Sequence, residues 1–215
     1  MGMLVVIDGL DGSGKQTQTE KLCEHLLANK IPTKRLSFPT YTRSSALIEL
    51  YLNGLLGSLD DVNVYAASTF FAVDRYASYV QDWRTPHSAD TVILTDRYVT
   101  ANLIHQMGKL PQDRWDDYMD WLDDLEHRRF GLPRPDIVFY LELPVDYAQS
   151  LIQARGTKPD LHETNRTYLE QCKHAAMTAA QRYNWVTVSC VKENKLRSIE
   201  DINMELWSIL TERMG

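Results

Sequence analysis

A glycine-rich turn with one lysine lies near the start of the sequence. Its residues, GLDGSGK from Gly9 to Lys15, have the spacing G-x-x-x-x-G-K of a phosphate-binding loop. The three glycines would let the backbone direct successive N–H groups at a phosphate, the following helix would add partial positive charge, and Lys15 would add a full charge. We therefore expect nucleotide phosphates to contact the loop and its successors: Gly9, Leu10, Asp11, Gly12, Ser13, Gly14, Lys15, Gln16 and Thr17.

The residue after Lys15 departs from the usual pattern, which has Ser or Thr there to ligate magnesium. Gln16 offers an amide oxygen on a longer side chain, so we expect it to reach Mg²⁺ directly or through a water. Thr17 would be a poor substitute, because one step along a helix rotates the side chain by roughly 100°. Asp96, at the end of the strand-like run TVILTD, is the stronger candidate for a second anchor of the metal and its water shell.

Short apolar runs that alternate with helical patterns must position these groups. Four runs are β-branched and nearly continuous, as in strands covered on both faces, and a fifth is more polar, as in an edge strand. The four are 3–8, 91–96, 136–143 and 185–190, and the edge candidate is 33–38. Ser198, with Asp201 three residues later, indicates the start of the last helix. The alternation predicts an α/β sandwich with a mostly parallel sheet, whose ligands bind beyond the carboxyl ends of its strands.

Length and composition narrow the class of protein. A chain of 215 residues with 44% apolar content predicts a single domain over 1–215. The net charge of −6 and the scattered basic residues argue against a nucleic-acid partner. The three cysteines lie far apart without a C-x-x-C pair, so we expect no zinc site, no disulfide framework and a cytoplasmic location. No apolar run approaches the roughly eighteen residues that a membrane span needs, so we expect no membrane partner.

The phosphate acceptor can be inferred from the groups that await it. A nucleoside hydroxyl needs a carboxylate base, whereas a nucleoside monophosphate arrives ionised and needs cations. The exit of the second strand-like run, FPTY (38–41), has no acid, while Arg75 and Arg97 lie where a helix and a strand could deliver them. The sequence therefore favours an acceptor that is already phosphorylated.

Five motifs occur in the order and approximate spacing of thymidylate kinases, and the resemblance extends across essentially the whole chain. They are DGLDGSGK (8–15), FPTY (38–41), FFAVDRY (70–76), TDRYVTAN (95–102) and GLPRPDIVFYLEL (131–143). The resemblance implies a three-layer sandwich with a five-stranded parallel sheet of the P-loop kinase type. It also implies phosphorylation of dTMP by ATP with Mg²⁺, and a homodimer packed through helices.

The resemblance further implies roles for the matched positions. Asp11 would accept a hydrogen bond from the 3′-hydroxyl of the deoxyribose. Phe71 would stack on thymine, and Arg75, one helical turn further, would reach the edge of the base. Arg97 would bind the acceptor phosphate, and with Lys15 and Asp96 would form the catalytic set. The implied substrate-binding residues are Asp11, Phe38, Tyr41, Phe71, Arg75, Arg97, Tyr98, Thr100, Asn102 and Gln106.

Structural alternatives stay open for several of these residues. Phe71 could be an ordinary core residue, Asp96 and Arg97 could form a structural ion pair, and Asp11 could cap the helix that follows it. Ala101 stands where many relatives have a serine near the thymine, so the donor to the base is open among Thr100, Asn102 and Gln106.

Residues 154–166, ARGTKPDLHETNR, lie where these kinases carry a mobile lid. Leu161 stands where an arginine is often found, which leaves the lid cation unassigned. Lys158 is our candidate for the transferring phosphate and Arg155 for the adenine end. All the cations of this segment, Arg166 included, could instead be solvated loop charges.

Two other functions are compatible with the sequence. One is a kinase for another nucleotide or for a deoxynucleoside. The second is a non-catalytic ATP-binding P-loop module, which the unusual residues Gln16 and Leu161 together suggest. Turnover with a panel of phosphate acceptors separates all three functions.

Overall fold

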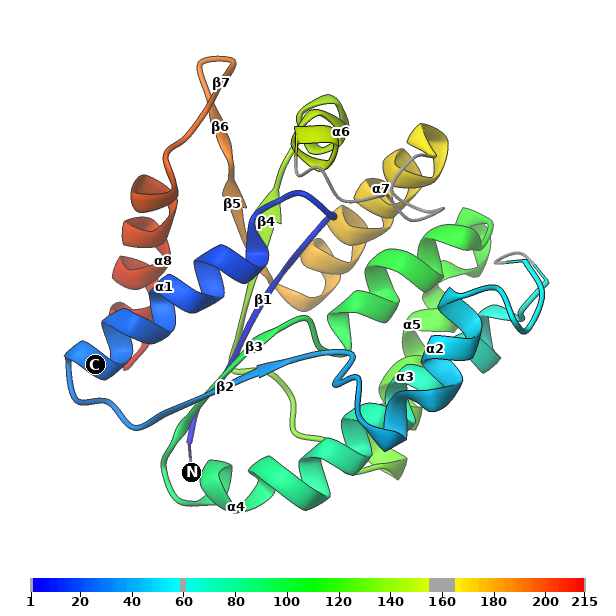
Figure 1. Cartoon of the computed structure of the whole chain (residues 1–215), viewed down its shortest axis with the longest axis horizontal. Helices are drawn as coiled ribbons and strands as arrows, with labels where there is room; N and C mark the ends of the chain where they lie inside the picture. Colours follow the sequence, from blue (N-terminus) through cyan, green and yellow to red (C-terminus); the bar gives the residue numbers. More distant parts are fainter. Residues whose placement is uncertain (1, 59–60, 155–164, 215) are drawn as a thin grey trace.

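A parallel sheet forms the centre of the computed structural model, which describes residues 2–58, 61–154 and 165–214 (Figure 1). Its five strands lie in the order β2-β3-β1-β4-β5, and every neighbouring pair is parallel. The strands are β1 (Leu4–Gly9), β2 (Thr33–Ser37), β3 (Val92–Asp96), β4 (Ile137–Glu142) and β5 (Val186–Ser189). The predicted α/β fold with a five-stranded parallel sheet is confirmed, and β2 is an edge strand as its polar sequence indicated.

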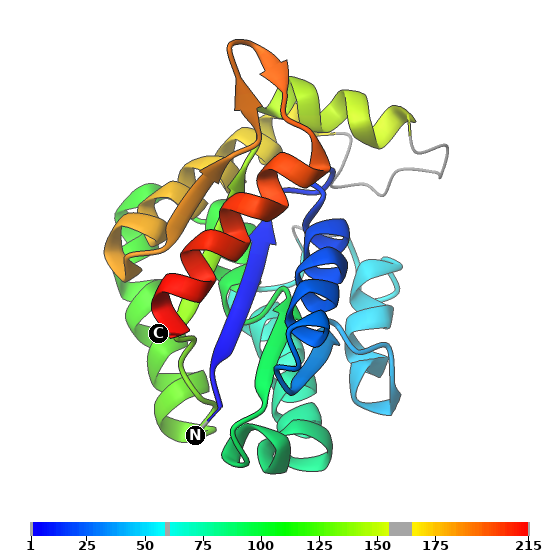
Figure 2. The same ribbon diagram turned by 90° about the vertical axis from the view of Figure 1, so that its left-hand side faces the viewer.

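Helices cover both faces of the sheet and complete the three layers. The α-helices are α1 (Lys15–Ala28), α2 (Ala46–Leu52), α3 (Val64–Ser78), α4 (Arg84–Ser88), α5 (Trp115–Asp123), α6 (Val145–Ala154), α7 (Arg166–Tyr183) and α8 (Ile199–Met214). Shorter helical turns are η1 (Arg43–Ser45), η2 (Tyr79–Trp83), η3 (Asn102–Gln106), η4 (Met107–Lys109), η5 (Gln112–Arg114) and η6 (Asp124–Arg129). Figure 2 shows α1 and α8 together on the side of the sheet that faces the viewer. In the described ranges, no helix combines the length and apolar character needed to cross a membrane.

The central strand β1 is buried on both faces. Leu4 and Val6 contact the apolar cluster that includes residues of α5 and α7, whereas Val5 and Ile7 contact the cluster that includes residues of α1 and α8. Side chains of a strand alternate between its faces, so a strand between two helical layers needs apolar residues at every position. The continuous apolar run in the sequence has this cause.

The two helices α1 and α8 are joined by polar contacts as well as by apolar packing. The Gln18 side chain donates to Ile199 O at 3.0 Å, and Asn203 Nδ2 donates to Gln18 O at 3.0 Å. The helix α8 begins as its sequence predicted, because Asp201 N donates to Ser198 Oγ at 3.0 Å. The helix that follows the phosphate loop is thus held to the last helix of the fold.

A small hairpin between β5 and α8 was not predicted. Its strands are β6 (Val191–Lys192) and β7 (Lys195–Leu196), which pair antiparallel. The turn between them is formed by Glu193 and Asn194, both with positive φ, at 52° and 59°. Two central residues with positive φ form the turn that best matches the twist of a two-residue hairpin. The hairpin projects beyond the sheet at the end where α8 begins (Figure 1).

Candidate nucleotide-binding site

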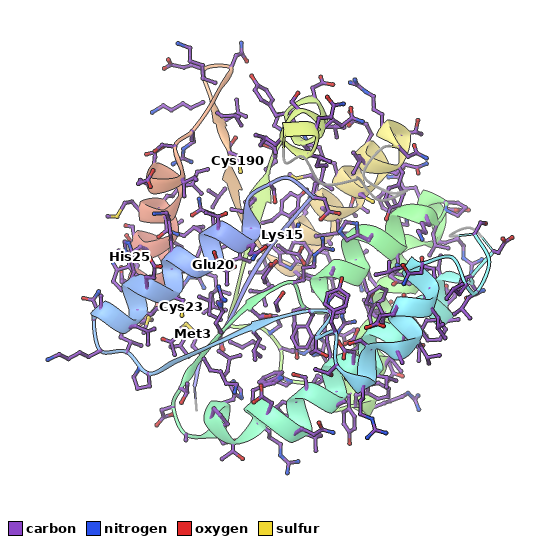
Figure 3. All side chains as sticks on the ribbon, in the orientation of Figure 1. Met3, Lys15, Glu20, Cys23, His25 and Cys190 are labelled. Carbon is purple, nitrogen blue, oxygen red and sulfur yellow. The ribbon has the colours of Figure 1, made fainter. Side chains whose placement is uncertain are left out.

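A cavity of about 800 Å³ lies beyond the carboxyl ends of the strands. Each of the five strands is followed closely by residues that line it: Asp11 after β1, Phe38 after β2, Arg97 after β3, Leu143 after β4 and Cys190 after β5. Figure 3 shows Lys15 and Cys190 toward the same end of the sheet, away from Met3. Ligands of open parallel sheets bind at this end, so the cavity is the candidate site.

The glycines of the phosphate loop are required by its backbone geometry. Gly12 and Gly14 have φ of 84° and 82°, a left-handed conformation that other residues rarely adopt. A Cβ on Gly12 would also lie 2.9 Å from Ala148 O, and one on Gly9 would lie 2.9 Å from Leu141 O. The loop therefore approaches neighbouring backbone too closely for any side chain, and it leads directly into α1.

Two cations of the site meet at one carboxylate. Lys15 Nζ donates to Asp11 Oδ1 at 3.0 Å, and Arg97 NH2 donates to the same oxygen. Partial burial alone would raise the pKa of Asp11, but the nearby charges of Arg97 and Lys15 lower it well below its ordinary value. One carboxylate, Asp11, thus contacts both an ammonium from the loop after β1 and a guanidinium from the turn after β3.

Arg97 is held in place by its backbone and by surrounding acids. Its φ is 65°, in the left-handed region, where it follows the last residue of β3. Burial alone would lower the pKa of Arg97, but the carboxylates of Asp11, Asp8 and Asp96 raise it. Its guanidinium therefore stays charged at any physiological pH.

Asp96 has the features of a metal ligand. Its Oδ1 is buried and has no hydrogen-bond partner within the described residues. Burial raises the pKa of Asp96 although Lys15 and Arg97 act in the opposite direction, so the carboxylate lacks compensation for its lost hydration. Mg²⁺ binds through one or two carboxylates together with substrate phosphates, and an unpartnered carboxylate beside a phosphate loop fits that role. Gln16 also lines the cavity, and its Nε2 donates to Glu20 Oε1 at 3.3 Å.

Helix α3 contributes an aromatic ring and a guanidinium to the opposite part of the cavity. Phe71 and Arg75, four residues apart on this helix, both line it. Arg75 is 2% exposed and forms a two-bond pair with Glu126 of η6, from Nε to Oε2 at 2.7 Å and from NH2 to Oε1 at 2.5 Å. Burial alone would lower the pKa of Arg75, but Glu126 raises it. The pair orients the guanidinium that borders the cavity.

The turn η3 adds amide groups beside Arg75. Asn102 Nδ2 donates to Ser68 O at 3.2 Å and to Glu126 Oε1 at 3.3 Å, and Asn102 itself lines the cavity. Gln106 lines it too, and its buried Oε1 has no hydrogen-bond partner among the described residues. This part of the cavity therefore offers a stacking ring together with polar groups, the combination that recognises a nucleobase.

Comparison with known proteins identifies the family of this chain. A family model described as thymidylate kinase matches residues 7–201. The chain belongs to the thymidylate kinase family. A thymidylate kinase of Mycobacterium tuberculosis is 32% identical over 158 residues, with 73% of each chain covered. One of Plasmodium falciparum is 26% identical over 212 residues, covering 98% of this chain and 90% of the relative.

A solved thymidylate kinase structure from Candida albicans has the same fold, with a TM-score of 0.75 and 22% identity over 99% of this chain and 92% of the other. The activity of the chain is therefore that of a thymidylate kinase, a phosphotransferase.

Two residues that the family resemblance suggested for substrate binding lie behind the cavity wall. Tyr98 is fully buried, and its hydroxyl donates to Pro133 O at 3.0 Å. Thr100 Oγ1 donates to Asp8 Oδ2 at 2.6 Å. These side chains connect the β3 turn to β1 and to the segment before β4, and their predicted contact with thymidylate stays a prediction.

Asp8 and Asp74 are supporting residues that the sequence reasoning missed. Asp8 is fully buried beneath the phosphate loop, and its Oδ1 accepts from Gly9 N at 2.9 Å. Burial raises the pKa of Asp8 in spite of the nearby Arg97. The sequence analysis placed Asp8 only at the end of a strand. A carboxyl group in an otherwise apolar run could have indicated its supporting role.

Asp74 accepts hydrogen bonds from the segment that follows β2. Its carboxylate accepts hydrogen bonds from Thr40 N at 2.8 Å, Thr40 Oγ1 at 2.6 Å, Ser44 Oγ at 2.6 Å and Ser45 Oγ at 2.8 Å. That loop carries Tyr41, which lines the cavity and has a φ of 51°. The acid of the family's DRY triplet thus fixes the backbone next to the Arg75 side of the site.

The predicted lid falls largely outside the described residues. Arg155, Lys158 and Leu161 lie in the part of the chain that the structure does not describe. Arg166, the first residue of α7, forms an ion pair with Asp146 at 2.6 Å. Among the lid cations, Arg166 is thus engaged with α6.

Proposed function

We propose that this chain transfers the γ-phosphoryl group of ATP to dTMP with Mg²⁺, giving dTDP and ADP by direct in-line transfer. The observation that supports this most is the convergence of Lys15 and Arg97 on Asp11 Oδ1. Lys15 belongs to the loop that would bind the donor, and Arg97 to the turn that would bind the acceptor. Phosphates of two nucleotides would therefore meet between them, which is the positioning that phosphoryl transfer requires.

Each charged group then has a defined task. The loop N–H groups and Lys15 would hold the donor phosphates, and Arg97 would bind the acceptor phosphate and the charge that develops during transfer. Asp96, with Gln16, would hold Mg²⁺, which when bound neutralises phosphate charge. Asp11, ionised because of its two cationic neighbours, would accept a hydrogen bond from the sugar hydroxyl once the phosphates attract Lys15 and Arg97.

The acceptor base would occupy the part of the cavity bordered by α3 and η3. Phe71 would stack on thymine, Arg75 would donate to the base edge, and Gln106 would supply its unpartnered amide oxygen as an acceptor for a ring N–H. The cavity of about 800 Å³ lies in the upper part of the roughly 300–1,000 Å³ range of ligand sites, in keeping with two nucleotides.

A panel of nucleosides and nucleoside monophosphates with ATP tests the assignment. dTMP is expected to have the highest kcat/KM, and dTDP formation is expected to vanish in Lys15→Ala and Arg97→Ala. Arg182→Ala is the matched control, because Arg182 pairs with Asp116 and Asp120 on the surface. A better acceptor than dTMP would refute the base pocket, and ATP binding without turnover would favour the non-catalytic module.

We also propose a homodimer in the cytoplasm. The homodimer is supported by exposed apolar side chains on and after α3, where Val73, Tyr76 and Val80 are 42%, 44% and 43% exposed. Sedimentation is expected to give a dimer for the wild-type chain and a monomer for Val73→Glu.

The cytoplasmic location is proposed because a free-thiol state of the three cysteines suits a reducing compartment. The lid over 154–166, with Arg155 and Lys158 as its cations, completes the proposal.

A further inference from the structure

A half-buried lysine outside the cavity lining is bonded to a phenol and not to an acid. Lys109, the last residue of η4, donates from Nζ to Tyr51 Oη at 2.5 Å. The same Nζ lies 6.0 Å from the centre of the Tyr168 ring. Within the described residues, Lys109 forms no ion pair with a carboxylate. Its ammonium therefore acts on the aromatic side chain of a neighbouring helix.

The turn that carries Lys109 is held against α7. A Cβ on Gly108 would lie 3.2 Å from Cys172 Cα, so η4 approaches the backbone of that helix closely. Tyr168, one turn before Cys172 on α7, donates from its hydroxyl to His105 O at 3.2 Å, just before η4. The lysine thus extends from a turn that α7 contacts at two points.

Helix α2 depends on this lysine for its polar attachment to the fold. The helix has seven residues, which is too short for stability without tertiary contacts. In the part of the chain that the structure describes, the bond from Lys109 to Tyr51 is the one side-chain hydrogen bond that joins α2 to another element. Tyr51 is 1% exposed, so loss of the ammonium would leave a buried hydroxyl without its partner.

The Tyr51 ring in turn contacts the ring that would stack on the acceptor base. The ring centres of Tyr51 and Phe71 are 6.3 Å apart, and the ring planes meet at 84°. Perpendicular aromatic pairs at this separation are favourable, so each ring restricts the orientation of the other. Phe71 lines the cavity, as does Leu52, the neighbour of Tyr51 on α2. A displaced Tyr51 would therefore change how Phe71 faces the cavity.

We propose that Lys109 is a positioning residue for the acceptor nucleotide. Its ammonium holds Tyr51, and Tyr51 holds the Phe71 ring in the orientation that stacks on the base. The proposal rests on the proposed function, because it takes Phe71 to stack on thymine. Since Lys109 does not line the cavity, its removal is expected to weaken recognition of the base and to leave the contacts with the acceptor phosphate intact.

Initial-rate kinetics with a base-free probe test this role. Lys109→Met keeps the length of the side chain and removes its donor. The KM of dTMP is expected to rise about fivefold, which corresponds to about 1 kcal/mol, the size of one hydrogen bond. The kcat and the KM of ATP are expected to stay within about twofold. The inhibition constant of 2-deoxyribose 5-phosphate, which has the acceptor phosphate without the base, is also expected to stay within about twofold.

Three further variants complete the comparison. Lys109→Arg keeps a cationic donor and is expected to restore the KM of dTMP. Tyr51→Phe removes the acceptor of the hydrogen bond and keeps the ring, so it is expected to raise the KM of dTMP as Lys109→Met does. It carries the test if Lys109→Met does not fold. Lys34→Met is the matched control, because Lys34 pairs with Asp82 at 2.6 Å and does not line the cavity, and it is expected to change none of these constants.

A double-variant cycle tests the route through Phe71. Phe71→Ala is expected to raise the KM of dTMP, and Lys109→Met added to it is expected to raise this constant no further. An independent rise in the double variant would overturn the proposal. Equal weakening of dTMP and 2-deoxyribose 5-phosphate would overturn it too, as would an unchanged KM of dTMP in both Lys109→Met and Tyr51→Phe.

These outcomes are distinct from a failure of the proposed function. If the wild-type chain forms no dTDP, the function is wrong whatever Lys109 does. If it forms dTDP while the Lys109 and Tyr51 variants show no loss specific to the base, only the role of Lys109 is wrong.

Discussion

The buried pair of Arg75 and Glu126 allows stability and substrate recognition to be separated. Both side chains are almost inaccessible, at 2% and 0%, and two hydrogen bonds of 2.7 and 2.5 Å join them. Removing one partner of such a pair leaves a buried charge without compensation, which costs about 3–5 kcal/mol. We expect Glu126→Gln to lose about that much of the free energy of unfolding, a large share of the roughly 5–15 kcal/mol of a typical domain.

The same reasoning predicts a different outcome when both partners are replaced. In Arg75→Met/Glu126→Leu no charge is buried, the volumes are similar, and Asn102 keeps its bond to Ser68 O at 3.2 Å. Apolar replacement of a whole buried pair is commonly neutral or stabilising. The double variant is therefore expected to unfold near the wild-type urea concentration, while its KM for dTMP rises at least about tenfold, because a charged hydrogen bond to the base contributes roughly 1.5–3 kcal/mol.

Urea unfolding and initial-rate kinetics measure the two effects. With a slope of roughly 2 kcal/mol per molar urea, Glu126→Gln is expected to lower the midpoint by about 2 M. Asp120→Asn, in an exposed ion pair, is the control and is expected to cost less than about 1 kcal/mol. A midpoint for Glu126→Gln within error of this control would refute the argument from burial. A double variant with normal KM for dTMP would instead remove Arg75 from the base pocket.

Three further predictions concern the metal and the loops. Burial raises the pKa of Asp96, so its ionised form destabilises the folded state once the pH rises above the ordinary pKa of Asp, near 4. Asp96→Asn is therefore expected to raise the Tm of the ligand-free protein more at pH 7 than at pH 4. The same variant is expected to lower kcat at least about tenfold. An equal Tm gain at both pH values would contradict this. Gln16→Ser is expected to stay active with an altered Mg²⁺ titration, and an unchanged titration would show that residue 16 does not approach the metal. Asp74→Ala frees the donors of the loop after β2 and is expected to raise the KM of dTMP several-fold more than that of ATP; equal changes in both would argue for a general loss of stability.

Local patterns were sufficient for the strands and the phosphate loop. A strand covered on both faces has a continuous apolar run, and a loop that approaches backbone such as Ala148 O requires glycine, so both features are visible within a few residues of sequence. The β6–β7 hairpin was missed because two-residue strands are too short to show a period.

Local patterns could not predict contacts between residues that are far apart in the sequence. Glu126 pairs with Arg75 from 51 positions away, and nothing in the spacing of acids singles it out. Tyr98 and Thr100 follow Arg97 closely in sequence, yet their side chains form hydrogen bonds to Pro133 and Asp8. Arg97 therefore lines the cavity while Tyr98 and Thr100 lie behind its wall. A motif that is contiguous in sequence thus contributes both to the lining of the cavity and to the packing behind it.

The bonds that join Gln18 to Ile199 and Asn203 make the order of synthesis relevant. The phosphate loop is synthesised well before α8, and the helix behind it gains these partners only when α8 has emerged. The strand that precedes the phosphate loop, β1, also lies between β3 and β4, which are synthesised later. We expect nascent chains halted before residue 199 to be neither retained by immobilised ATP nor protected by it from proteolysis. Nucleotide affinity would then be gained only after α8 has been synthesised.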